Sequence, residues 1–319
     1  MPFENSSGEN RSGENTVSVQ TTIDVAMGFD HRYIPHSANV MSAIMRHAPG
    51  APVRFIMLSS GLTEEQKRRM EAVAPGAKVV WVEVGDDDLP AYADRGHLNR
   101  TVLYRLGLEW MAPADCHRVI YIDADIVLMG DIRELWNADL GGHAIGAVTD
   151  HWQDVPEFAK LWGLPSEDAR YFNAGLQVID LDKVKAGKLF SKALDFVIEH
   201  DKKLLFGDQD ALNYVFWKNS AVIEPAWNVQ RFQSAKERAS ETRADRKWGK
   251  PTPRMIHYTG TEKPWARNVW HPWAWAYWEN LRRTPYLKEV QATYKMDTAQ
   301  LMRLRLRWLM RRPAGTFLQ

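Results

Sequence analysis

The chain has 319 residues, of which 45% are hydrophobic and 25% are charged, and these proportions exclude a disordered or fibrous protein. Lysine and arginine number 41 against 40 aspartates and glutamates, which argues against a surface coated with the positive charge that nucleic-acid binding requires. The single cysteine, Cys116, excludes an internal disulfide, and no stretch reaches the roughly 18–20 uninterrupted apolar residues of a membrane span. We therefore expect a cytoplasmic protein of one large or two ordinary domains.

The first half of the chain alternates predicted strands and helices after a polar tail. Residues 1–20 repeat a Glu-Asn pair between serines and glycines and lack the apolar core of a secretion signal, so we expect them to be disordered. The predicted strands cover 22–27, 53–58, 78–84 and 118–122, and the predicted helices cover 35–47, 63–74 and 101–110. Strands separated by helices of this length favour right-handed crossovers and a mostly parallel sheet covered on both faces, in a Rossmann-like α/β unit.

The second half continues the alternation less regularly. Strands are predicted at 144–148, 176–179 and 255–257, helices at 183–200 and 209–216, and an exposed excursion at 233–254. No linker is strong enough to split the chain, so the prediction is one catalytic domain over 21–280 with a C-terminal extension over 281–319.

The strongest local signal is an acidic pair at the end of an apolar strand. Asp123 and Asp125 follow the predicted strand at 118–122, and the carboxyl edge of an open α/β sheet is where such folds bind ligands. If the strand continues, its alternation places both carboxylates on one side, where two hard oxygen ligands suit a divalent cation. A pair of helix-capping aspartates in a loop is the alternative interpretation.

A second cluster follows the last predicted strand. His257 ends this strand, and a turn with Gly260 and Lys263 comes next. A histidine nitrogen favours Mn²⁺ over Mg²⁺, and a lysine ammonium can neutralise phosphate charge. A lone histidine among apolar residues is more often structural, so this interpretation depends on the neighbouring residues.

A third cluster combines amide and carboxylate side chains. Asn173 lies in Phe172-Asn173-Ala174-Gly175, and Asp208 and Gln209 follow a predicted helix. These side chains are natural hydrogen-bond partners for sugar hydroxyls. In isolation, each segment is more typical of turns and helix N-caps than of a sugar-binding site.

Together, these segments resemble glycosyltransferase family 8, the retaining GT-A enzymes that include glycogenin and the bacterial lipooligosaccharide α-galactosyl- and α-glucosyltransferases. The resemblance covers about Ile23 to Trp265 and rests on the order and spacing of its motifs. These motifs are Asp30-x-x-Tyr33, Tyr104-Arg105, Asp123-Ala124-Asp125, Phe172-Asn173-Ala174-Gly175, Asp208-Gln209-Asp210 and His257-x-x-Gly260-x-x-Lys263-Pro264-Trp265.

The resemblance implies a GT-A fold and a set of ligand contacts. It implies that Asp123, Asp125 and His257 hold Mn²⁺, which also binds the diphosphate of a UDP-sugar donor. The other implied contacts are Asp30 and Tyr33 for the uracil and ribose, Gly260 and Lys263 for the diphosphate, and Arg105, Asp150, Asn173, Asp208 and Gln209 around the donor sugar. One departure is Arg32, where the family often has asparagine before the tyrosine. UDP-galactose or UDP-glucose is the implied donor, and a lipopolysaccharide-type glycan is the expected acceptor.

The resemblance also implies retention at the anomeric carbon. Retention by double displacement needs a nucleophile, and retaining glycosidases use a carboxylate for this purpose. At the matching place the sequence offers Gln209, a poor nucleophile, beside Asp208. We therefore expect front-face attack by the acceptor hydroxyl, with a diphosphate oxygen taking its proton, Gln209 stabilising positive charge through its carbonyl, and Lys263 stabilising the leaving group.

The C-terminal segment 301–312 carries five arginines, no acidic residue and apolar residues throughout. This pattern favours an amphipathic segment on the anionic inner face of a membrane, and a helix docked on the domain is the alternative. Trp265, Trp270, Trp273, Trp275 and Trp278 form a dense aromatic run, for which core packing is the favoured interpretation.

Two other function classes compete with the transferase. The segment Ile122-Asp123-Ala124-Asp125-Ile126-Val127 also fits the nucleophile motif of haloacid-dehalogenase-like phosphatases. That motif should follow the first strand, whereas three predicted strands precede it here, and it leaves His257 and Lys263 without a role. The second competitor is a non-catalytic module that binds nucleotide sugars and docks on membranes.

Overall fold

The computed structural model describes residues 21–90, 100–150, 154–230, 253–267, 271 and 273–311. The predicted tail 1–20, most of the predicted excursion 233–254 and Trp270 lie outside the described residues.

A seven-stranded sheet forms the centre of the molecule, in the order β3-β2-β1-β4-β7-β6-β8. Its strands are β1 (Ile23–Gly28), β2 (Val53–Ser59), β3 (Lys78–Glu83), β4 (Arg118–Ile122), β6 (Ile145–Thr149), β7 (Phe172–Asp180) and β8 (Ala221–Val222). Neighbouring strands are parallel except that β7 runs antiparallel to both β4 and β6. The predicted mostly parallel α/β sheet is therefore confirmed.

Helices cover both faces of this sheet because its strands carry apolar side chains on both sides. In β1, Val25 and Met27 pack in one core while Ala26 packs in the other, as strand alternation requires. The first core receives α1 (Ile34–His47), α2 (Glu64–Glu71), α4 (Ile132–Trp136) and α10 (Ala274–Leu281). The second receives α3 (Leu108–Met111), α6 (Leu181–Gly187), α7 (Leu189–His200) and α8 (Asp208–Val215).

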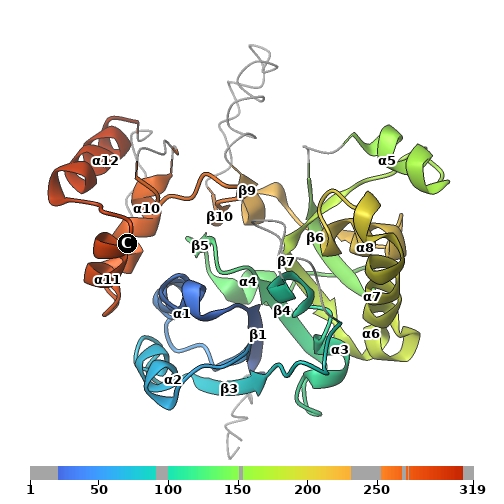
Figure 1. The fold of residues 1–319 in the computed structure, drawn as a ribbon, viewed down its shortest axis with the longest axis horizontal. Coiled ribbons are helices and arrows are strands. Elements are labelled where there is room, and N and C mark those ends of the chain that lie inside the picture. The colour runs from blue at the N-terminus through green and yellow to red at the C-terminus, as the bar shows by residue number, and fades with distance from the viewer. Residues whose placement is uncertain are drawn as a thin grey trace, which may run out of the picture.

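A second, three-stranded sheet has the order β5-β10-β9 and joins distant parts of the chain. Its strands are β5 (Ile126–Leu128), β9 (Val229–Gln230) and β10 (Met255–His257). The last helices, α11 (Leu287–Thr293) and α12 (Thr298–Arg311), lie with α10 on the opposite side of the view from α5 (Val155–Trp162) and α6–α8 (Figure 1). None of the helices that the structure describes is long and apolar enough to cross a bilayer.

Two helix predictions are wrong in detail. Residues 101–110 form a 3₁₀ turn at Arg100–Leu103 and a single α-helical turn at α3 instead of one helix. The predicted helix 183–200 is two helices, because Lys188 adopts a left-handed conformation at φ 48° between α6 and α7. The predicted helix 63–74 is confirmed as α2, and a capping box of Thr63 and Gln66 forms its start.

Candidate active site

The acidic pair lies on a tight turn that connects the two sheets. β4 ends at Ile122, and β5 begins at Ile126, so the strand does not continue through Asp123 and Asp125 and its alternation does not place their side chains. The turn brings the two carboxylates together instead. It is held at both ends by backbone hydrogen bonds, from Asp123 N to Gly175 O at 2.9 Å and from Tyr258 N to Asp125 O at 3.0 Å.

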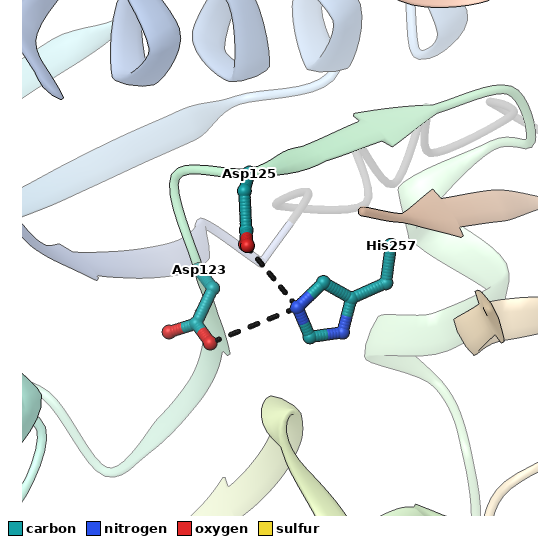
Figure 2. A group of neighbouring side chains, drawn as sticks. All are labelled: Asp123, Asp125 and His257. Atoms are coloured by element: carbon teal, nitrogen blue, oxygen red, sulfur yellow. Dashed lines mark ion pairs between the residues drawn. The ribbon is translucent and has the colours of Figure 1, made fainter. Parts of the chain in front are cut away.

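Asp123, Asp125 and His257 converge on one point (Figure 2). His257 Nε2 lies 3.2 Å from Asp125 Oδ1 and 3.9 Å from Asp123 Oδ2. One ligand atom from each of the three side chains lies within 4.8 Å of the other two. Gly175 leaves the space for this approach, because a Cβ at that position would be 2.2 Å from His257 Cε1 and 2.7 Å from Asp123 Oδ2.

A chain of amide hydrogen bonds fixes which nitrogen of His257 faces the carboxylates. Asn173 Nδ2 donates to Asp150 Oδ2 at 3.1 Å, and Asn228 Nδ2 donates to Asn173 Oδ1 at 2.9 Å. Asn228 Oδ1 is therefore turned toward His257 Nδ1, at 3.1 Å, as a hydrogen-bond acceptor. This arrangement assigns the proton to Nδ1 and directs the lone pair of Nε2 at Asp123 and Asp125.

The donor set fits a divalent cation with mixed oxygen and nitrogen ligands. A bare imidazole nitrogen and two carboxylates that face one another have no mutual donor, and a cation between them would satisfy all three. Burial alone would raise the pKa of Asp125, but the positive charge of the Lys263 ammonium outweighs it and holds that pKa well below its usual range. Asp125 is therefore ionised, as a metal ligand must be.

Lys263 brings a cationic group to the same point. Its ammonium forms an ion pair with Asp125 Oδ2 and donates to Tyr258 O at 2.8 Å. Gly260 lies in the same turn with φ +74°, a left-handed conformation that favours glycine. The turn after β10 thus places a positive charge beside the three ligands.

Arg105 links the acidic pair to Asp208. Its side chain is 6% exposed, and it forms ion pairs from Nη2 to Asp123 Oδ1 at 2.9 Å and from Nε to Asp208 Oδ2 at 2.7 Å. Its guanidinium also lies 4.5 Å from the centre of the Tyr121 ring. Burial, opposed by Arg105 and reinforced by Asp123, raises the pKa of Asp208 to about 7. Asp208 therefore titrates near neutrality.

Gln209 is held against the start of β7. Its Oε1 accepts hydrogen bonds from Ala174 N at 2.9 Å and from Asn173 Nδ2 at 3.2 Å, and its Nε2 lies 3.4 Å from Asp150 Oδ2. Both lone pairs of the amide oxygen are thus engaged within the chain.

Asp210 secures the loop that precedes α8. It accepts hydrogen bonds from the backbone N–H groups of Leu205 and Phe206, at 2.7 and 2.9 Å, and from the Tyr171 hydroxyl. The hydrogen bonds of Asp210 therefore fix the first turn of α8, which carries Asp208 and Gln209.

These groups line one cavity of about 430 Å³. The predicted site residues on its wall are Tyr33, Arg105, Asp123, Asp125, Asp150, Asn173, Asp208, Gln209, His257, Gly260 and Lys263. Asp30 is the predicted site residue that is not on this wall. It caps the turn at residues 31–33 by accepting from Arg32 N at 2.9 Å, and it pairs with the Arg32 guanidinium at 2.6 Å.

Residues 24–269 match the model of glycosyl transferase family 8. The chain belongs to glycosyltransferase family 8. This glycosyltransferase is 26% identical over 266 residues to general stress protein A of Bacillus subtilis strain 168, which is 81% of this chain and 92% of that protein. It is also 26% identical over 262 residues to a lipopolysaccharide 1,2-glucosyltransferase of Escherichia coli K12, which is 81% of this chain and 75% of that enzyme.

Solved structures agree with the family in their fold. The galactosyltransferase LgtC, in complex with donor and acceptor sugar analogues, matches this family 8 enzyme with a TM-score of 0.73 and 23% identity, over 85% of this chain and all (100%) of LgtC. The predicted GT-A fold is confirmed. The predicted transferase is likewise confirmed as the enzyme class, over the phosphatase interpretation.

The structure adds residues that the sequence did not single out. Asn228 orients His257 but lies in a stretch without a recognisable motif, as the last residue of a short 3₁₀ turn directly before the two-residue strand β9. The ring of Tyr121, in β4, contacts the Arg105 guanidinium, although its place in an apolar strand is typical of a core residue. Position 175 requires glycine, because a Cβ there would collide with His257, and only the tertiary structure shows this contact.

Proposed function

We propose that this family 8 enzyme moves galactose or glucose from a UDP-sugar to a lipopolysaccharide-type glycan, with retention and with Mn²⁺ as cofactor. The observation that carries the proposal is the lone pair of His257 Nε2 directed at Asp123 and Asp125, with Lys263 beside them. A relative that is a lipopolysaccharide 1,2-glucosyltransferase supports the acceptor class. The nitrogen ligand favours Mn²⁺ over Mg²⁺.

We assign roles to the predicted site residues, which all lie on the cavity wall except Asp30. Asp123, Asp125 and His257 would hold the metal, which supplies charge stabilisation for the diphosphate leaving group. Tyr33 and Asp30 are assigned to the nucleoside, and Gly260 and Lys263 to the diphosphate. Arg105, Asp150, Asn173, Asp208 and Gln209 are assigned to the donor sugar.

The proposed reaction is a front-face substitution. The bond from the anomeric carbon to the diphosphate oxygen breaks, the acceptor oxygen bonds to the same face of that carbon, and the acceptor proton passes to the diphosphate. Asp208 is a poor alternative nucleophile because it is buried, bound by Arg105 and raised in pKa to about 7. Gln209 carries an amide, and its carbonyl would stabilise the cationic sugar after releasing one of its internal hydrogen bonds.

The test is release of UDP from UDP-galactose and UDP-glucose by the full chain, with and without Mn²⁺. We expect Asp125→Asn to abolish the metal-dependent release. Asp131→Asn is the matched control, because Asp131 is an aspartate six residues away that caps α4 and pairs with Arg133 but does not line the cavity. Cleavage of p-nitrophenyl phosphate, or nucleotide binding without UDP release, would contradict the proposal.

We also propose that α12 attaches the enzyme to the anionic inner face of a membrane. Leu301, Leu304 and Trp308 pack on the first core, which also receives α10. Met302, Leu306, Leu309 and Met310 are exposed, at 46 to 77%. Arg303 and Arg305 are exposed as well. A helix with one face on the protein and a second apolar face flanked by arginines suits a lipid surface.

Liposome flotation tests this attachment without unfolding the helix. We expect Met302→Ser/Leu306→Ser/Met310→Ser to lose binding to vesicles that contain anionic lipid while keeping UDP release. The control is Leu161→Ser/Ile198→Ser, which removes apolar side chains of similar exposure, 56 and 57%, from α5 and α7. Equal recovery of both variants with vesicles would refute the membrane role of α12.

A further inference from the structure

A buried aromatic stack connects two walls of the cavity. Trp265, two residues after Lys263, is 3% exposed. Its ring lies flat against His36, with 3.7 Å between centroids and 18° between planes. Tyr33 meets both rings edge-on, with centroids 5.4 Å from His36 and 6.3 Å from Trp265. The stack thus contacts Tyr33 directly and Lys263 through the backbone.

Helix α10 anchors both halves of this stack. Tyr277 Oη lies 2.7 Å from His36 Nδ1, and Trp278 Nε1 donates to Pro264 O at 3.0 Å. Tyr277 and Trp278 are each 1% exposed. The same helix therefore holds α1, where His36 lies, and the turn that presents Lys263.

His36 in this stack is neutral near neutral pH. Burial lowers the pKa of His36 to about 3, with Asp125 and Lys263 acting on it in opposite directions. A neutral imidazole can pack against an indole without the cost of burying a charge. The contact between His36 and Trp265 is accordingly a permanent part of the fold at physiological pH.

Trp265, His36, Tyr277 and Trp278 are not among the described residues that line the cavity. An effect of the stack on a ligand is therefore indirect, and the contacts described above lead to Tyr33 and Lys263. We infer that Trp265, with His36 and Tyr277, is a positioning residue that sets the separation between Tyr33 and Lys263, and hence the length of nucleoside diphosphate that the site accepts. This inference rests on the proposed function, which assigns Tyr33 to the nucleoside and Lys263 to the diphosphate.

If the separation between Tyr33 and Lys263 is fixed before binding, it strengthens the binding of UDP more than the binding of uridine or diphosphate alone. Without the stack, the turn that carries Lys263 would have to become ordered when UDP binds. Fixing the backbone of one additional residue weakens the affinity for UDP by about fivefold to thirtyfold. We expect Trp265→Leu to raise the Kd for UDP with Mn²⁺ by about tenfold. The Kd for uridine and the Kd for inorganic diphosphate should each rise less. With UDP-sugar, KM should rise while kcat is kept.

Milder variants separate positioning from a general loss of stability. Tyr277→Phe keeps the ring and removes the hydroxyl beside His36, so we expect a rise of about twofold to tenfold in the Kd for UDP, the effect of one hydrogen bond. Trp265→Phe should recover part of the affinity that Trp265→Leu loses. Tyr286→Phe is the matched control, a tyrosine that is also 1% exposed, and its hydroxyl has no hydrogen-bond partner among the described residues.

Calorimetry of the full-length variants, well below their melting temperatures, decides the question. A Kd for UDP within twofold of wild type in Trp265→Leu overturns the inference. The inference is also overturned if Trp265→Leu loses as much affinity for uridine or for diphosphate as it loses for UDP. Absence of UDP binding by the wild type would instead refute the proposed function.

Discussion

Replacing Asn228 should weaken metal binding without touching a metal ligand. Asn228 Oδ1 is the acceptor 3.1 Å from His257 Nδ1, and His257 is 4% exposed, so water cannot readily replace the amide. In Asn228→Ala the imidazole either keeps an unsatisfied Nδ1–H or moves its proton to Nε2, where it blocks the metal. Loss of such a partner typically costs 10- to 100-fold in metal affinity, or about 1.4–2.7 kcal/mol.

Titration calorimetry with Mn²⁺, at a pH where wild-type binding is measurable, reads out this change. Asn280→Ala is the matched control, because Asn280 is as buried as Asn228 and its Nδ2 donates to Asn39 O at 2.6 Å, away from the ligands. We expect this control to melt at a lower temperature and to bind Mn²⁺ as the wild type does. If Asn228→Ala bound Mn²⁺ within twofold of wild type, the assignment of the His257 proton to Nδ1 would be refuted.

Three further predictions concern the same site and the stability of the fold. Gly175→Ala should lower Mn²⁺ affinity at least tenfold, since its Cβ would lie 2.2 Å from His257 Cε1, and calorimetry measures this. Arg54→Leu should lower the free energy of unfolding by about 3–5 kcal/mol in urea denaturation, because it leaves Asp24 buried and unpaired. His36 binds a proton only when unfolded between pH 6.5 and about 3, so stability should fall as pH falls there, by up to about 1.4 kcal/mol per pH unit. His36→Asn should flatten this slope in urea denaturation at pH 7 and 5.

The sequence by itself determined the alternation of strands and helices in the first half of the chain. Apolar runs at 53–59 and 118–122 are strands because both faces of the sheet are covered. Local signals such as the Thr63 capping box also act within a few residues, so they could be predicted without the fold. The order and spacing of the motifs were likewise sufficient to predict the family.

The sequence was less informative where backbone conformation depends on packing. Lys188 carries no turn signal, yet it adopts the left-handed conformation that separates α6 from α7. The end of β4 at Ile122 was predicted, but the sequence left open whether strand geometry continues through Asp123, whose N–H is bound by the backbone of β7 instead.

The tertiary structure alone decided how the metal ligands meet. His257 lies opposite Ile126 because β10 pairs antiparallel with β5, and this register places its ring beside Asp125. Asn228 reaches His257 because the two-residue strand β9 pairs with β10. Strands this short leave no hydrophobic period in the sequence, so their pairing, and the direction of the imidazole that depends on it, follows only from the packed fold.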